Sequence, residues 1–133
     1  MADRESDRPE LALPPDSPLI AHVGPAWGII PLRVPGGWTV HHNALDARLL
    51  DSGLVEVNDS EDLVWMQRAR PPWLDAAKTW RDVALDVGWY RRLFRVVLLD
   101  PDWDNVAAAH ETTDLDELVE VIERWLLKPP IVE

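Results

Sequence analysis

The stretch DVALDVGWYRRLFRVVLLD, residues 82–100, decides the fold. In residues 83–89 every second side chain is a large apolar one, a period of two that is typical of a half-buried strand. Residues 94–99 are apolar apart from Arg95, which predicts a central strand covered on both faces. The two segments together predict a β-hairpin, with its turn at residues 90–92 and a bulge at Gly88.

The segment DLDELVEVIERWLL, residues 114–127, carries apolar side chains at helical spacing on one face. Thr113 is the expected N-cap, with Asp116 completing a capping pair, and Pro129-Pro130 ends the helix. We expect this amphipathic helix to pack on one face of the sheet.

The other strands are expected on either side of turn signals. Residues 28–34 and 38–43 flank Pro35-Gly36-Gly37 and predict a second hairpin, while residues 63–68 and 106–111 predict single strands. Residues 46–62 are interpreted as a polar, acidic connection. The predicted fold class is therefore α+β, an antiparallel β meander of about five strands with the C-terminal amphipathic helix on one face. Residues 1–18 are expected to be a flexible, Pro-rich, charged tail, and residues 19–133 a single domain.

Charge and composition exclude several classes of function. The net charge of −11 disfavours nucleic acids and anionic membranes as partners. The absence of Cys excludes disulfide scaffolds and thiol catalysis. No apolar run approaches the length of a membrane helix, and the charged N-terminus does not resemble a secretory signal, so we expect a cytoplasmic protein.

Catalytic and metal-binding patterns are sparse. No serine lies in a nucleophile-elbow pattern, and no phosphate loop or dinucleotide fingerprint occurs. The segment DPDWDNVAAAHE, residues 100–111, has carboxylates at four positions of a calcium loop, but it lacks the turn glycine and a preceding helix. The expectation is a protein that is not an enzyme and has no metal or cofactor. A carboxylate-based enzyme or a calcium-binding protein remains an alternative.

The distribution of charge indicates a binding surface. Residues 100–123 contain nine acids and no Lys or Arg, and the acids of the helix lie away from its apolar face. Such a negative surface beside an exposed indole favours a basic protein partner, because acids speed association and a buried aromatic supplies affinity. A generic interaction or regulatory module is the alternative. The predicted partner-binding residues are Asp102, Trp103, Asp104, Glu111, Asp116 and Glu120, with Trp73 as a second exposed aromatic.

Two sets of motifs carry a family resemblance. The first is RVPGGWTV, residues 33–40, followed by Asn43; the second runs through LDVGWY (85–90), FRVVL (94–98), Asp102-Trp103, Glu111-Thr112 and the acidic helix ending in Trp125-Leu126. Across residues 28–127 the chain resembles small acidic bacterial immunity proteins of polymorphic or contact-dependent toxin systems. The resemblance implies an acidic, cytoplasmic, single-domain protein that binds and blocks a toxin domain and has no catalytic residues. We expect a monomer or a weak dimer.

Overall fold

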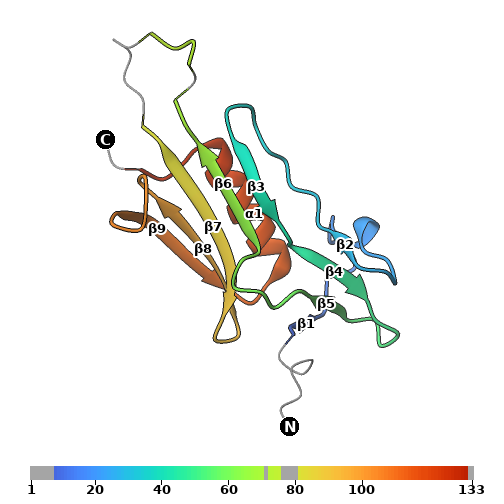
Figure 1. Ribbon diagram of the computed structural model, residues 1–133. Coiled ribbons are helices and arrows are strands. Elements are labelled where there is room, and N and C mark those ends of the chain that lie inside the picture. Colours follow the sequence, from blue (N-terminus) through green and yellow to red (C-terminus); the bar gives the residue numbers. More distant parts are fainter. Residues whose placement is uncertain (1–7, 71, 76–80, 132–133) are drawn as a thin grey trace.

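The computed structural model describes residues 8–70, 72–75 and 81–131, and its main layer is an antiparallel sheet of five strands. The helix α1 (Leu115–Leu127) packs on one face of this sheet, against β8 and β9 (Figure 1). The predicted α+β class, an antiparallel sheet with a C-terminal helix on one face, is therefore confirmed. In spatial order the strands are β3 (Thr39–Asn43), β6 (Val64–Arg68), β7 (Val83–Tyr90), β8 (Leu93–Leu99) and β9 (Val106–Thr112).

The β7–β8 hairpin forms where the sequence predicts it, and Tyr90 pairs with Leu93 across a two-residue turn. Both turn residues have positive φ angles, 51° at Arg91 and 67° at Arg92. This geometry is typical of the type I′ turn, because its twist matches that of the two flanking strands.

Strand β7 is buried on both faces over most of its length, whereas its alternating sequence predicts a half-buried strand. Its large apolar side chains join the main core on the side of α1. On the opposite face Ala84 packs with Val97 and Leu99 of β8, and Trp65 of β6 lies against them. The side chains that cover this second face belong to the neighbouring strands β6 and β8. The alternation within β7 alone therefore does not predict that both faces are buried.

Gly88 pairs regularly with Arg95, so the predicted bulge at Gly88 is wrong. The glycine is needed for a different reason. A Cβ at this position would overlap the backbone carbonyl of Glu61, in the connection that leads into β6. Gly88 therefore permits a close approach between β7 and residues 58–63.

Helix α1 is capped by Asp114, whose side chain accepts hydrogen bonds from two backbone N–H groups of the first turn. The prediction of Thr113 as N-cap is wrong by one residue. At the other end of the helix the indole N–H of Trp38 donates to the carbonyl oxygen of Leu126 at 2.9 Å. Side chains thus satisfy backbone groups at both helix ends, where intrahelical partners are missing.

A second antiparallel sheet, which the sequence pattern does not predict, lies beside the first (Figure 1). Its order is β1 (Glu10–Leu11), β5 (Val55–Val57), β4 (Asp46–Leu49) and β2 (Gly28–Ile29). Residues 46–62, interpreted above as a connection, therefore form the β4–β5 hairpin. The buried Glu56 of β5 is accommodated because the Nε of Arg48 donates to its carboxylate at 2.6 Å.

The hairpin predicted between residues 28–34 and 38–43 is wrong. Strand β2 pairs with β4 and strand β3 pairs with β6, so the two segments belong to different sheets. Strand β2 ends at Ile29, shortly before Pro31, which has no N–H to donate to a strand ladder.

Part of the predicted N-terminal tail packs on the folded domain. The carbonyl oxygen of Pro9 accepts the N–H of Val57, and β1 pairs with β5. Further along, the buried Ser17 donates its hydroxyl to Asp116 at 2.6 Å, before a short 3-10 helix, η2 (Ile20–His22). Residues 8–18 are therefore ordered by contacts with β5 and α1, which a local reading of the sequence does not anticipate.

One continuous buried cluster includes side chains from both sheets and from α1. No helix in the described part of the chain is long and apolar enough to cross a membrane. Representative members of the cluster are Ile30, Leu45, Val57, Leu85, Phe94, Leu118 and Ile122.

Candidate functional site

The face of the five-stranded sheet turned away from α1, called the open face below, carries a row of paired side chains. His42 of β3 pairs with Trp65 of β6, and Trp65 pairs with Asp86 of β7. Directly paired residues project from the same face of a sheet. An imidazole, an indole and a carboxylate therefore stand side by side across three strands.

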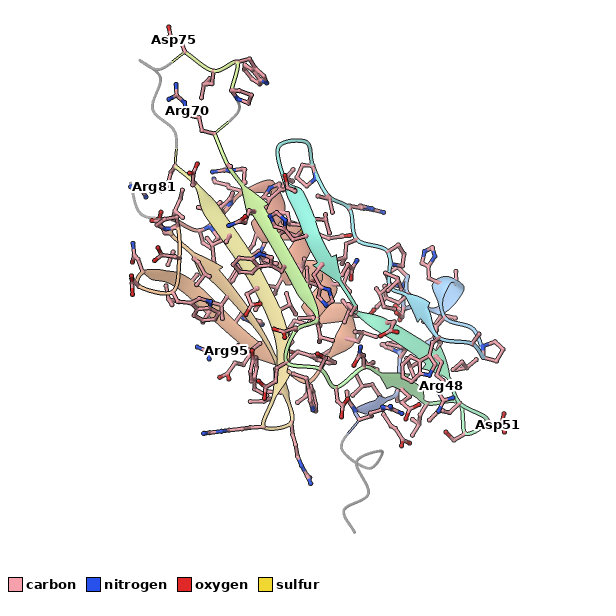
Figure 2. The ribbon with its side chains drawn as sticks, viewed as in Figure 1. Arg48, Asp51, Arg70, Asp75, Arg81 and Arg95 are labelled. Atoms are coloured by element: carbon pink, nitrogen blue, oxygen red, sulfur yellow. The ribbon has the colours of Figure 1, made fainter. Side chains whose placement is uncertain are left out.

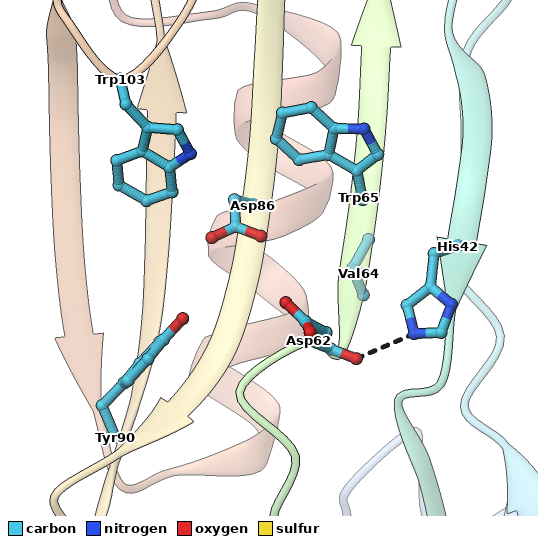
Figure 3. Close-up of a pocket in the computed structure, with 7 residues that line it drawn as sticks. All are labelled: His42, Asp62, Val64, Trp65, Asp86, Tyr90 and Trp103. Atoms are coloured by element: carbon cyan, nitrogen blue, oxygen red, sulfur yellow. Dashed lines mark hydrogen bonds between the residues drawn. The ribbon is translucent and has the colours of Figure 1, made fainter.

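These side chains line a cavity of about 500 Å³, called the open-face pocket (Figure 3). Trp103, from the loop between β8 and β9, and Tyr90, at the end of β7, form two further walls. Asp62, which precedes β6, adds a second carboxylate. In Figure 3 the carboxylate of Asp86 lies at the centre, between the indoles of Trp65 and Trp103 on one side and Tyr90 and Asp62 on the other. The volume is within the range of small-ligand pockets.

Asp86 is only 8% exposed, and in the described residues its carboxylate has no hydrogen bond or ion pair. Burial, followed by the negative charge of Asp62, raises the pKa of Asp86 from 3.8 to about 6, against the opposing effect of Arg95. Burial and the nearby carboxylates also raise the pKa of Tyr90, so its hydroxyl keeps its proton at neutral pH. Asp86 is therefore ionised at neutral pH and can accept a cation or a hydrogen-bond donor.

Residues 58–63 hold Asp62 beside Asp86. The imidazole Nε2 of His42 lies 2.8 Å from the backbone carbonyl oxygen of Asp62 (Figure 3). The hydroxyl of Tyr90 donates to the backbone carbonyl oxygen of Glu61 at 3.1 Å. Two side chains of the open face thus fix the backbone of this connection. The second carboxylate of the pocket is consequently set by the fold.

The loop that presents Trp103 is held by hydrogen bonds of its own side chains. The carboxylate of Asp102 accepts the backbone N–H of Asp104 at 3.0 Å, and the amide of Asn105 donates to the carbonyl of Asp100 at 2.9 Å. Trp103 remains 55% exposed in this ordered loop. An exposed indole on a fixed backbone is a suitable anchor for a partner.

The partner-binding residues predicted from the sequence lie on separate surfaces. Asp102, Trp103 and Asp104 lie together in the β8–β9 loop. Glu111 of β9 pairs with Arg95, which places its side chain on the open face as well. Four of the predicted residues therefore lie on or beside the same face as the pocket.

Asp116 and Glu120 lie on α1, at the opposite side of the sheet. Asp116 accepts the hydroxyl of Ser17, and Glu120 lies 3.8 Å from Arg124. The structure therefore does not bring these acids together with Trp103. Trp73 is 81% exposed and belongs to the connection after β6, between Arg70 and Asp75, which are labelled beyond the end of β6 in Figure 2.

The residues that build the centre of the pocket were not predicted from the sequence. Asp86 lies between the large apolar positions of β7, but the alternating pattern does not reveal the aromatic side chains that make it part of a pocket. Asp86 is the only charged residue of strand β7, and this is the signal that could have identified it. The other members missed are His42, Asp62, Trp65 and Tyr90.

The acids of the calcium-loop pattern, residues 100–111, do not converge on one point in the structure. Asp100 lies 3.5 Å from Arg81, and Glu111 lies within β9. In the parts of the chain that the structure describes, no three His, Asp or Glu side chains converge so that they could hold a metal ion. The calcium alternative is therefore not supported by the geometry.

The open-face pocket is thus a concave, negatively charged surface with aromatic walls, built on an antiparallel sheet. No protein-family model, curated protein or solved structure matches this chain.

Proposed function

We propose that this protein binds a basic protein partner on the open face of its five-stranded sheet. The observation that carries the proposal is the open-face pocket, where Asp86 and Asp62 stand among the rings of Trp65, Trp103 and Tyr90. Buried aromatic side chains supply most of the affinity at protein interfaces, and complementary charge supplies specificity and fast association. The net charge of −11 favours a basic partner over an acidic one.

The proposed partner is a toxin domain, as the resemblance to immunity proteins implies. Binding would inhibit the toxin by covering its surface, without any chemical step. The exposed Trp103, with Asp102 and Asp104 beside it, would meet the toxin first, and the pocket would hold one of its cationic side chains. The acids of α1 are assigned no role in this contact, because Asp116 and Glu120 lie on the other side of the sheet.

A carboxylate-based hydrolase is the second candidate, and one observation favours it. A carboxyl group with a pKa of about 6, beside a second carboxylate in an aromatic pocket, has the properties of a general acid–base pair. The two functions differ in their dependence on Asp86. An enzyme with Asp86→Asn loses turnover and keeps substrate affinity, whereas a cation-binding protein with this substitution loses affinity.

The experiment compares the affinity of variants for a basic partner recovered from the native cells and then purified. Trp103→Ala and Asp86→Asn should each weaken binding about tenfold or more, which corresponds to about 1.4 kcal/mol. Trp73→Ala is the matched control for a lost exposed indole. Asp51→Asn is the matched control for a lost negative charge, because Asp51 lies in the β4–β5 turn, away from the pocket (Figure 2).

Inhibition is measured separately, by adding the protein to the partner in a toxicity assay. The proposal requires that wild type suppress toxicity and that Trp103→Ala suppress it less. If Glu120→Gln weakens binding while the two pocket variants bind normally, the partner uses the helix face and the proposal is wrong.

A further inference from the structure

Asp86 is 8% exposed, and its carboxylate, which points into the pocket, has no hydrogen bond or ion pair in the described residues (Figure 3). Arg95 shares the open face with Asp86, but no ion pair within 4 Å joins the two side chains. A largely buried carboxylate without protein donors is unfavourable, because it has lost part of its hydration and receives no hydrogen bond from the protein. The geometry therefore indicates an external donor, and the negative charge indicates a cationic one.

The walls of the pocket discriminate between kinds of cation. The indole of Trp65 is the direct cross-strand neighbour of Asp86, and Trp103 lies across from it. A guanidinium group is planar, stacks on aromatic rings and donates two parallel N–H bonds to one carboxylate. An ammonium group is a compact, strongly hydrated charge, so it loses more hydration free energy than a guanidinium when it enters a largely buried site.

The chain itself contains the arrangement that a guanidinium would make here. In the second sheet Arg48 lies 5.0 Å from the centre of the Trp27 ring and donates to the buried Glu56 at 2.6 Å. Arg8 lies 5.5 Å from the same ring and 3.9 Å from Glu56. There, an indole and a buried carboxylate are both contacted by arginine. In the open-face pocket an indole and a largely buried carboxylate stand side by side, and none of the described residues that line it is an arginine, although the charge of Arg95 acts on Asp86 from outside the pocket.

We propose that the open-face pocket is a guanidinium site that receives an arginine side chain of the partner. Asp86 is the main acceptor, Asp62 contributes a second negative charge, and Trp65 and Trp103 are the stacking surfaces. This inference rests on the proposed function, since it names the group by which a basic protein is held. We further expect that a lysine side chain binds this pocket more weakly than an arginine side chain does.

The experiment titrates the whole protein with two blocked peptides of equal length and charge, oligoarginine and oligolysine, at about pH 7.5 and physiological salt. The two peptides carry equal charge, so the long-range attraction of the acidic surface is the same for both, and the loss of the preference in the pocket variants assigns it to the pocket. Wild type should prefer oligoarginine about tenfold or more. Asp86→Asn and Trp103→Ala should reduce the preference to about twofold or less. Asp51→Asn and Trp73→Ala should retain it.

Equal affinity of wild type for the two peptides, or a preference that survives in Asp86→Asn, overturns the inference. Circular dichroism verifies that each variant is folded, and Asp62→Asn provides a second pocket variant, expected to show a smaller loss of preference. The two proposals fail differently. If the purified partner depends on Asp86 and Trp103 while the peptides bind equally, only the guanidinium assignment is wrong. If the partner ignores both residues, the proposed function is wrong.

Discussion

Trp65 and Asp86 are direct register partners on β6 and β7, so an indole and a nearly buried carboxylate share the middle of the open face. Folding raises the pKa of Asp86 from 3.8 to about 6, which means that the folded state favours the protonated carboxyl. Above this pKa the ionised Asp86 destabilises the fold. A residue that lowers stability in this way is typical of functional sites.

Replacing Asp86 by Asn should stabilise the folded protein at neutral pH. The pKa displacement corresponds to an upper value of about 3 kcal/mol, and because the pocket opens to solvent we expect about 1–2 kcal/mol. The gain should decline as the pH falls through about 6 and vanish below about 4, where Asp86 is protonated in both states. Urea unfolding of both proteins across this pH range measures it, and a gain that does not change with pH would contradict the assigned cause.

Binding of oligoarginine should weaken when the solution is acidified. The groups that face Asp86 are Asp62, Arg95, Tyr90 and His42, and protonation of Asp86 removes the central negative charge among them. Between about pH 7.5 and pH 5 the dissociation constant should rise up to about tenfold, because arginine itself does not titrate in this range. Asp86→Asn should show a much smaller change. Affinity that rises on acidification would exclude Asp86 as the acceptor.

Gly88→Ala should destabilise the protein and disturb the pocket, because the added Cβ would overlap the backbone carbonyl of Glu61. Relieving this overlap must displace residues 58–63, which carry Asp62, at a cost of about 1–3 kcal/mol or more. Gly36→Ala is the control, since nothing lies within 4 Å of its Cβ position, and it should change stability by less than about 1 kcal/mol. Equal unfolding midpoints for the two variants would refute the close approach.

Asp114→Ala should cost about 1 kcal/mol of stability, because the side chain of Asp114 accepts two N–H groups at the start of α1. Thr113→Ala, at the exposed position before it, should cost less than about 0.5 kcal/mol. Thermal unfolding of the two variants distinguishes the N-cap observed in the structure from the one expected from the sequence. A larger loss for Thr113→Ala would reverse the assignment.

Long periodic segments were predictable from the sequence, and short segments stabilised by distant partners were not. The hairpin of β7 and β8 and the helix α1 carry their own patterns, so both were located correctly. Strands β4 and β5 are four and three residues long, and the polar Arg48 and Glu56 within them suggest a connection. These two side chains satisfy each other, which only the fold reveals.

The candidate site was predictable in part for a similar reason. Trp103 and its neighbouring acids were predicted from composition, and the structure places this indole at the pocket. Asp86, Asp62 and Trp65 come from three separate segments, and their proximity depends on the β6–β7 register and on the connection beside Gly88. No local sequence pattern contains that information. The predicted binding surface therefore included the acids of α1, which lies on the other side of the sheet.

The most direct test follows the tryptophan indole N–H signals by nuclear magnetic resonance while oligoarginine is added to the labelled protein. We predict that the signals of Trp65 and Trp103 shift most and saturate together, while those of Trp73 and the buried Trp125 stay in place. Shifts confined to Trp73, or spread equally over all the indoles, would contradict the claim that the open face of the sheet is the binding surface.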